Sequence, residues 1–330
     1  MVRKNISQII QGVLGNRIDW ENLSWADIKD ALNRRWGEKI EKYQNAVKNG
    51  GEFSWIQPDD SNVPRKPNDL AINHLIEWGI PLQVTGDPQK AVLFLCLFNP
   101  RMDREANDSS LTSIQDFSRE KEDFYVSDRF NSKKDEVITK EDLQPKIIEL
   151  ERDMIQVEKD YQKWYKSTQE KDRGCYYSSN YYKSLLDEGE IKPETICNLE
   201  LVPYRSPKEK DVNVCSTSYL TGIVILKRVY DYLKNSEQQK IFFVMRGFKD
   251  YCALFDKILK AYPFMLGDVL INDYPQLEDY MIKYNKQVFY TFSSRRGYIS
   301  ANNLVMKNDG KSEKVPEVFE AIRASIIDKK

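Results

Sequence analysis

The pattern of apolar positions predicts four buried strands separated by helices. The runs at 91–98, 196–202, 241–245 and 288–292 are largely apolar. Parallel sheets require such runs, because helices cover both faces of each strand. Apolar residues recur at helical spacing over 218–233 and 248–261, and a last helix is expected over 316–327. This alternation predicts a three-layer α/β/α fold around a four-stranded, mainly parallel sheet.

The N-terminal part of the chain has a helical pattern of its own. Residues 24–27 (Ser-Trp-Ala-Asp) resemble a capping box that opens a long helix, and Asn-Gly-Gly at 49–51 ends it. Two prolines and several polar residues over 61–68 indicate a linker. We therefore expect a helical extension over 1–66 and an α/β domain over 67–330.

The stretch between the first and second strands, 101–192, is too long and too charged for a simple crossover, and we interpret it as a helical insertion. Charged and polar residues over 103–140 favour a loop. Six apolar residues further on recur at spacings of three and four and predict one long helix that packs on the domain. They are Ile147, Leu150, Met154, Val157, Tyr161 and Trp164.

Composition narrows the possible partners. The chain has 50 basic and 51 acidic residues. It therefore lacks the overall basic excess typical of nucleic-acid binders, and any such binding depends on local charge. No apolar run reaches the ~20 residues of a membrane helix, and the N-terminus has no secretory pattern. We expect a cytoplasmic protein that does not bind membranes.

Cysteine and histidine usage gives no sign of a metal centre. The five cysteines form no Cys-x-x-Cys pair, and His74 is the single histidine. Cys96 and Cys197 lie in apolar runs, where a buried thiol acts as a small apolar side chain. The sequence therefore predicts neither a metal nor another cofactor.

Each predicted strand is followed by at least one arginine. The segments concerned are Asn99-Pro100-Arg101, 200–206 with Arg205, Arg246-Gly247, and 293–297 with Arg295 and Arg296. In open parallel sheets, ligands bind beyond the carboxyl ends of the strands. Arginine is common on surfaces, but cations gathered on one rim would attract a polyanion. Tyr204 and Tyr298 lie among them, either to stack on bases or as part of the core.

These strand ends resemble, in order and placement, the motifs of the uracil-DNA glycosylase superfamily. The shared order is a strand ending in Asn-Pro, a strand ending in a polar residue before a hydrophobic-Pro pair, strand-Gly-helix, and a strand with a Ser-rich loop. It covers roughly 70–305, interrupted by the insertion. The resemblance implies a monofunctional DNA glycosylase that flips a base, uses a positioned water and needs no cofactor.

Asn99 matches the asparagine that holds the attacking water in this superfamily. Breaking an N-glycosidic bond gives an oxocarbenium-like sugar and an anionic base, so positioning and electrostatics suffice for much of the catalysis. A turn asparagine before proline is the alternative interpretation.

Glu200 stands where relatives have an asparagine that reads the edge of uracil. An ionised carboxylate only accepts hydrogen bonds, so it suits the exocyclic amine of cytosine and disfavours a carbonyl oxygen. We therefore predict a cytosine-type base. An ion pair with Arg205 or Arg246 would account for a strand-end glutamate equally well.

Two departures from the superfamily pattern affect the expected site. Leu97 replaces a glycine, and Arg101 stands where glycine or tyrosine limits the space beside the base C5 atom, which suits a larger polar C5 substituent. The histidine of the last motif is missing, and Ser293 or Ser294 occupies that region. Expected base-recognition residues are Glu200, Phe98, Pro100, Arg101 and Tyr204. Expected contacts to the leaving base or to DNA are Ser293, Ser294, Arg295, Arg296, Tyr298 as a wedge, Arg205 and Arg246.

With a carboxylate placed to accept from an amine and an enlarged pocket beside C5, the expected site resembles that of the phage-defence glycosylases of this superfamily. The resemblance implies removal of glucosylated hydroxymethylcytosine from phage DNA, leaving abasic sites, with modified phage DNA as the partner. Two alternatives remain open. A catalytically inactive nucleic-acid sensor of the same fold fits the missing histidine and glycine. A hydrolase of nucleotides or nucleosides fits if Arg205 and Arg246 hold a phosphate.

Overall fold

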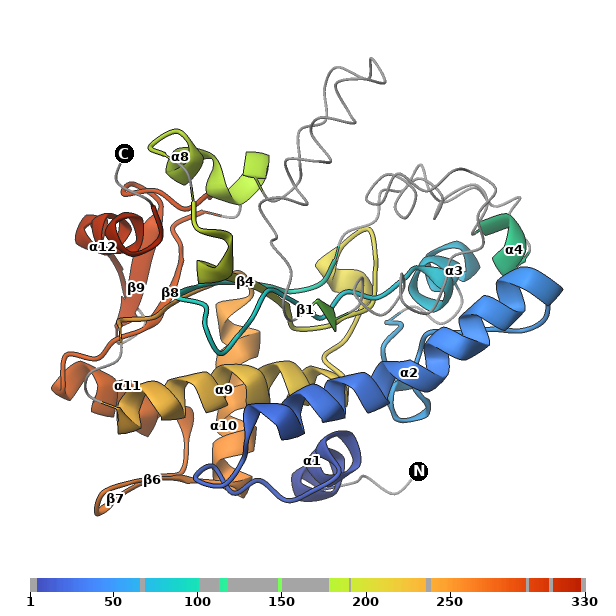
Figure 1. The fold of residues 1–330 in the computed structure, drawn as a ribbon, viewed down its shortest axis with the longest axis horizontal. Helices are drawn as coiled ribbons and strands as arrows, with labels where there is room; N and C mark the ends of the chain where they lie inside the picture. The colour runs from blue at the N-terminus through green and yellow to red at the C-terminus, as the bar shows by residue number, and fades with distance from the viewer. Residues whose placement is uncertain are drawn as a thin grey trace.

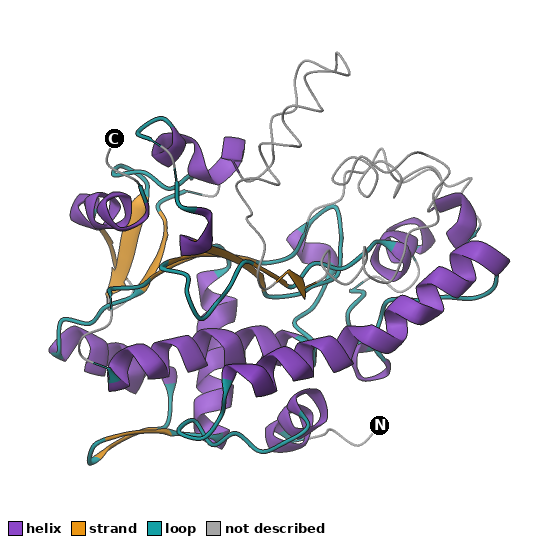
Figure 2. Ribbon diagram, viewed as in Figure 1, coloured by secondary structure: helices purple, strands orange, loops and turns teal. Residues whose placement is uncertain are grey.

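The computed structural model of the chain describes residues 5–65, 69–100, 113–117, 148–149, 178–189, 191–235, 239–294, 297–308 and 311–327. These residues form an α/β fold in which helices pack on both faces of a mixed central sheet (Figure 1, Figure 2). The expected α/β class is therefore confirmed. No helix among these residues is long and apolar enough to cross a bilayer.

Four parallel strands form the centre of the sheet. Their spatial order is β4 (Ile196–Glu200), β2 (Leu93–Leu97), β5 (Phe242–Met245) and β8 (Phe289–Phe292). Every residue of β2, β4 and β5 is buried, as strands covered on both faces require. They coincide with the four apolar runs of the sequence.

The whole sheet is larger and more mixed than the expected four-stranded, mainly parallel one. β1 (Val84–Thr85) is antiparallel to β4, and β3 (Ile148–Glu149) is parallel to β1. At the other edge, β9 (Leu304–Asn308) and β10 (Lys311–Lys314) continue the sheet in antiparallel fashion. β1 and β3 are too short, and β10 is too exposed, to show a strand-like apolar pattern.

Two hydrophobic cores lie on opposite faces of the sheet. Along β2, Phe94 and Cys96 enter the larger core, whereas Leu93, Leu95 and Leu97 enter the smaller one, because alternate side chains point to opposite faces. The described helices that supply the larger core are α1 (Ile6–Leu14), α2 (Trp25–Asn49), α3 (Leu70–Trp78), α4 (Ile114–Phe117), α9 (Ser218–Lys234), α10 (Phe248–Ala261) and α11 (Tyr274–Lys283). Those that supply the smaller core are α8 (Lys183–Leu186) and α12 (Pro316–Ile326).

Shorter elements connect these parts. They are the helical turns η1 (Pro58–Asp60), η4 (Ser178–Tyr182), η5 (Pro193–Thr195) and η6 (Glu209–Asp211), and the separate hairpin of β6 (Phe264–Leu266) and β7 (Val269–Ile271). Within the expected insertion, the structure describes α4, β3, η4 and α8. The helix predicted from Ile147 to Trp164 lies outside the described residues except at 148–149, which form a strand instead.

The N-terminal helices belong to the larger core. α2 begins with the expected capping box, in which the Ser24 hydroxyl accepts from the Asp27 amide and the Asp27 carboxylate accepts from the Ser24 amide. The Trp36 indole then donates to Gln83 Oε1 at 2.9 Å, close to β1. Trp20 donates to the carbonyl of Tyr262 at 2.8 Å, at the end of α10. Buried indole hydrogen bonds thus tie this region to the sheet and its helices.

The described cysteines are free thiols, and Cys96 and Cys197 are fully buried, as the sequence predicts. Burial raises the pKa of both thiols well above the usual value. The two side chains therefore stay protonated and serve as core residues. Cys175 lies outside the described residues.

Candidate active site

The chain changes direction across the sheet between β2 and β5. From β2 it continues to β4 on one side, and from β4 it returns through α9 to β5 on the other side of β2. In open α/β sheets, ligands bind at the carboxyl ends of two adjacent strands whose connections diverge in this way. The segments at this switch point are 98–100 after β2 and Arg246-Gly247 after β5.

Asn99 is held by its amide group. Its Nδ2 atom donates to Ser206 Oγ at 2.9 Å, to the Pro100 carbonyl at 3.1 Å and to the Tyr204 carbonyl at 3.3 Å. All three partners accept, so they fix which end of the amide is nitrogen. The half-buried side chain keeps Oδ1 as its remaining polar atom. An external donor such as water suits this oxygen.

Backbone hydrogen bonds join the loops after β2 and β4. The amides of Leu201 and Val202 donate to the carbonyls of Leu97 and Phe98 at 2.9 and 2.8 Å. The Ser206 amide donates to the Pro100 carbonyl at 3.3 Å, and its hydroxyl donates to the Lys208 carbonyl at 2.8 Å. The two loops therefore form one connected support for Asn99.

Phe98 packs against the start of α10. Gly247 has φ 77°, and a Cβ atom there would lie 3.2 Å from Phe98 Cδ2. The preceding Arg246 amide donates to the Cys96 carbonyl at 2.7 Å. Tyr251, one turn into α10, donates through its hydroxyl to the Leu97 carbonyl at 2.7 Å. The end of β2 is thus supported from both neighbouring strands.

Glu200 is the last residue of β4 and pairs in register with Leu97. Its side chain is 1% exposed. The backbone is fixed, since its amide donates to the Gln83 carbonyl at 2.9 Å and its carbonyl accepts from Thr221 Oγ1 at 2.8 Å. Burial raises the pKa of Tyr251 well above its usual value, and the neighbouring Cys96 and Glu200 raise it further. A buried carboxylate therefore lies on the strand beside the end of β2.

Arg246 lies between aromatic rings of two different elements. Its guanidinium carbon is 5.1 Å from the centroid of Tyr181 and 5.6 Å from that of Phe292, within the range of cation–π attraction. Nη2 donates to the Gly297 carbonyl at 3.3 Å. Its buried Nε atom has no hydrogen-bond partner. Arg246 therefore links η4, β8 and the loop after β8.

The Tyr204 side chain is not positioned to stack on a base. Its side chain is fully buried. The hydroxyl donates to Asp60 Oδ2 at 2.7 Å and accepts from the Gln57 amide at 3.1 Å, and the ring lies edge-on to Trp36. The expectation of a base stacked on Tyr204 is therefore wrong for this conformation, and the core alternative applies. The residue contributes to the site through its carbonyl, which accepts from Asn99.

The remaining predicted residues are spread over several places. Arg205 Nε donates to the Ile80 carbonyl at 2.5 Å, just after α3. Ser293 and Ser294 are exposed after β8, where the Ser293 amide donates to the Asn303 carbonyl. Tyr298 follows in the same loop and is 42% exposed. Arg101, Arg295 and Arg296 lie outside the described residues.

The structure thus places Phe98, Asn99, Pro100, Glu200 and Arg246 at the carboxyl ends of three adjacent strands, β4, β2 and β5. Sequence patterns gave no role to Ser206 or Tyr181. Ser206 lies six residues after the end of β4 and reaches Asn99 only because the loop folds back, whereas Tyr181 lies in the insertion. In the part of the chain that is described, no group of three His, Cys, Asp or Glu side chains is arranged to hold a metal.

Comparisons with known proteins add no relative. No protein-family model matches the chain, and neither the curated proteins nor the solved structures include a significant match.

Proposed function

We propose that the chain is a DNA glycosylase that hydrolyses the N-glycosidic bond of a modified cytosine in phage DNA, with glucosylated hydroxymethylcytosine as the substrate base. The observation that carries the proposal is the oriented amide of Asn99 at the topological switch point of the sheet. In its Asn-Pro strand end and its strand-end glutamate, the chain resembles the phage-defence enzyme bacteriophage replication inhibition DNA glycosylase.

Asn99 would orient the attacking water. Because Nδ2 is engaged by three acceptors, Oδ1 accepts a hydrogen bond from the water and directs its oxygen towards the sugar C1′ atom. The bond between C1′ and the base nitrogen breaks, the electron pair leaves with the base, and a new C1′–O bond forms. The proton of the water passes to solvent or to the departing base. Positioning of this kind lowers the barrier without a strong nucleophile.

Glu200 would select the base, which must displace the residues that cover this buried carboxylate. Its carboxylate accepts from the exocyclic amine of a cytosine and repels the O4 carbonyl of uracil at the same place. Arg246 follows β5 at the same switch point, where two aromatic rings hold its guanidinium, and this cation would stabilise the negative charge that develops on the leaving base. The target nucleotide must first leave the duplex, which requires unstacking energy of a few kcal/mol.

The test uses oligonucleotides that carry one uracil, hydroxymethylcytosine or glucosylated hydroxymethylcytosine, as single strands and as duplexes. After incubation, alkali converts abasic sites into strand breaks. We expect breaks with the glucosylated base and a loss of about 100-fold or more in rate for Asn99→Ala. Asn272→Ala, at an exposed asparagine before α11, is the matched control and should retain the wild-type rate.

Glu200→Gln tests base selection separately. Glutamine donates as well as accepts, so we expect slower excision of the cytosine-type base and a gain of uracil excision. Absence of breaks on every substrate, or breaks that survive Asn99→Ala, would refute the glycosylase proposal. Tight binding of modified DNA without a released base, followed by mass spectrometry, would instead select the sensor. Activity on free nucleotides alone would select the nucleotide hydrolase.

A further inference from the structure

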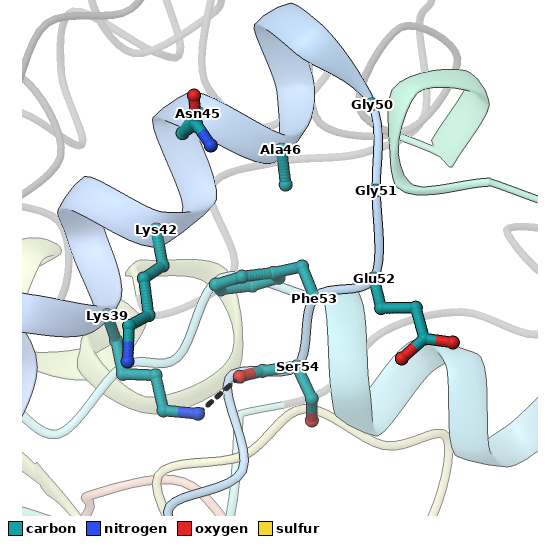
Figure 3. Close-up of a pocket in the computed structure, with 9 residues that line it drawn as sticks. All are labelled: Lys39, Lys42, Asn45, Ala46, Gly50, Gly51, Glu52, Phe53 and Ser54. Atoms are coloured by element: carbon teal, nitrogen blue, oxygen red, sulfur yellow. Dashed lines mark hydrogen bonds between the residues drawn. The ribbon is translucent and has the colours of Figure 1, made fainter.

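A cavity of about 400 Å³ lies between the second half of α2 and the segment 50–54 that follows it. Lys39, Lys42 and Asn45 line it from one face of α2, since they are spaced three residues apart. Figure 3 shows the Phe53 ring projecting from the opposite wall towards α2, with both lysine side chains beside it. Gly50 and Gly51 close one end without side chains. Its volume lies within the range of small-molecule sites.

The side chains that α2 contributes to the cavity supply hydrogen-bond donors. Lys39 Nζ donates to the carbonyls of Ser54 and Ile56 at 2.6 and 2.7 Å, which leaves one of its three protons for a ligand. Lys42 pairs with Glu38 in an exposed ion pair, a contact that contributes little and is readily exchanged. The Asn45 oxygen accepts from Asn49 at 2.6 Å, so its amide nitrogen remains as a donor.

The charge of the cavity favours an anion. Burial, and then the nearby charge of Lys42, lower the pKa of Lys39 below its usual value. An anion between the two ammonium groups would relieve this repulsion. The carboxylate that lines the cavity, Glu52, points away from the lysines in Figure 3.

Phe53 adds an aromatic surface. Its ring is half-buried, contacts Tyr43 and Trp55 in edge-to-face geometry at 5.4 and 5.1 Å, and lies 6.0 Å from Lys39 Nζ. An aromatic face next to cations is the combination with which proteins hold an unpaired nucleotide, by stacking on the base and pairing with the phosphate.

We propose that this cavity binds a nucleotide, with the phosphate on Lys39 and Lys42 and the base against Phe53. The site is separate from the strand ends around Asn99 and does not rest on the proposed glycosylase activity. The nucleotide is either free or one unit of a single strand of DNA, because both present the same phosphate and base.

The experiment measures binding to the full chain by titration calorimetry with dCMP, deoxycytidine and inorganic phosphate. We expect dCMP to bind saturably and both fragments to bind about tenfold more weakly or not at all, since each makes part of the contacts. Lys42→Gln and Phe53→Leu should each weaken dCMP binding about fivefold to tenfold. Lys257→Gln, at an exposed lysine of α10, is the control and should leave binding unchanged.

Photo-crosslinking with 5-iodo-dCMP locates the site. We expect the label on the tryptic peptide 49–65, which contains Phe53, and not on peptide 91–101, which contains Asn99. Asn99→Ala should keep the label, so failure of the glycosylase proposal and failure of this one are distinguishable. A labelled hexanucleotide that binds more tightly than dCMP at the same peptide would identify single-stranded DNA as the source. No saturable binding, or binding unaffected in both variants, would overturn the proposal.

Discussion

The Nδ2 atom of Asn99 donates a hydrogen bond to the hydroxyl oxygen of Ser206 at 2.9 Å. The same hydroxyl donates to the Lys208 carbonyl, so its proton is committed and its lone pair faces Asn99. Ser206 therefore supplies the shortest of the three contacts that orient the amide, and the two carbonyl acceptors lie at longer distances. This contact connects the loop after β4 to the residue proposed to position the water.

We expect Ser206→Ala to slow base excision by about tenfold while leaving substrate binding unchanged. Without the hydroxyl, only the two carbonyl acceptors at 3.1 and 3.3 Å hold the Asn99 amide nitrogen, so the amide oxygen is less firmly placed towards the water. Single-turnover rates at several DNA concentrations measure both quantities. Ser325→Ala, which removes a helix hydroxyl bonded to the Ala321 carbonyl in α12, is the control. A weaker affinity with an unchanged rate would contradict the positioning role.

Gly247 and Gly267 provide a matched test of the contact between Phe98 and α10. Both have left-handed φ angles, 77° and 62°, so alanine at either site introduces backbone strain of roughly 1 kcal/mol. Only at Gly247 does the new methyl group meet Phe98, at 3.2 Å, whereas nothing lies within 4 Å at Gly267. In urea unfolding, Gly247→Ala should lose more free energy than Gly267→Ala. Equal losses would show that Phe98 moves away without penalty.

Tyr204→Phe should destabilise the fold by about 1–3 kcal/mol, because a buried hydrogen-bond partner is lost. The Gln57 amide loses its acceptor and Asp60 loses one donor. Asp60 keeps Arg35 and the Thr217 amide, both at 3.0 Å, so the protein should still fold. Tyr298→Phe, at an exposed ring, should change the unfolding free energy by less than about 0.5 kcal/mol. Similar values for both variants would contradict the buried network.

The elements that could be predicted from the sequence are those with strong periodicity. α10 has the predicted bounds, and α9 differs from them by one residue. Helical spacing over fourteen or more residues leaves little ambiguity. β10 has the sequence Lys-Ser-Glu-Lys and is exposed on both faces, so its pairing with β9 has no signal in the apolar pattern.

The candidate site was predictable only in part, because strand ends can be read from local sequence and contacts between loops cannot. Asn99 and Glu200 follow apolar runs, and the parallel pairing of β2 with β4 places them near each other. Tyr204 was ambiguous, because a tyrosine near a strand end suits a base or a core equally. Its buried hydroxyl donates to Asp60, which is 144 residues away. Long-range hydrogen bonds of this kind leave no trace in spacing.

His74 allows a direct measurement of one pKa, since it is the chain's single histidine. Its ring stacks on Trp78 at 4.1 Å with an interplanar angle of 15°, and burial lowers its pKa below 6.5. The imidazole proton signals in an NMR titration should therefore give a midpoint below 6.5. Because the folded state disfavours the charged ring, His74 makes its full contribution to the free energy of unfolding above pH 6.5, where the ring is neutral. This contribution is lost as the pH falls below that value. His74→Gln should reduce this loss between pH 6.5 and 5.5 in urea unfolding. A midpoint above 6.5, or an unchanged pH dependence in the variant, would show that the ring is not desolvated in solution.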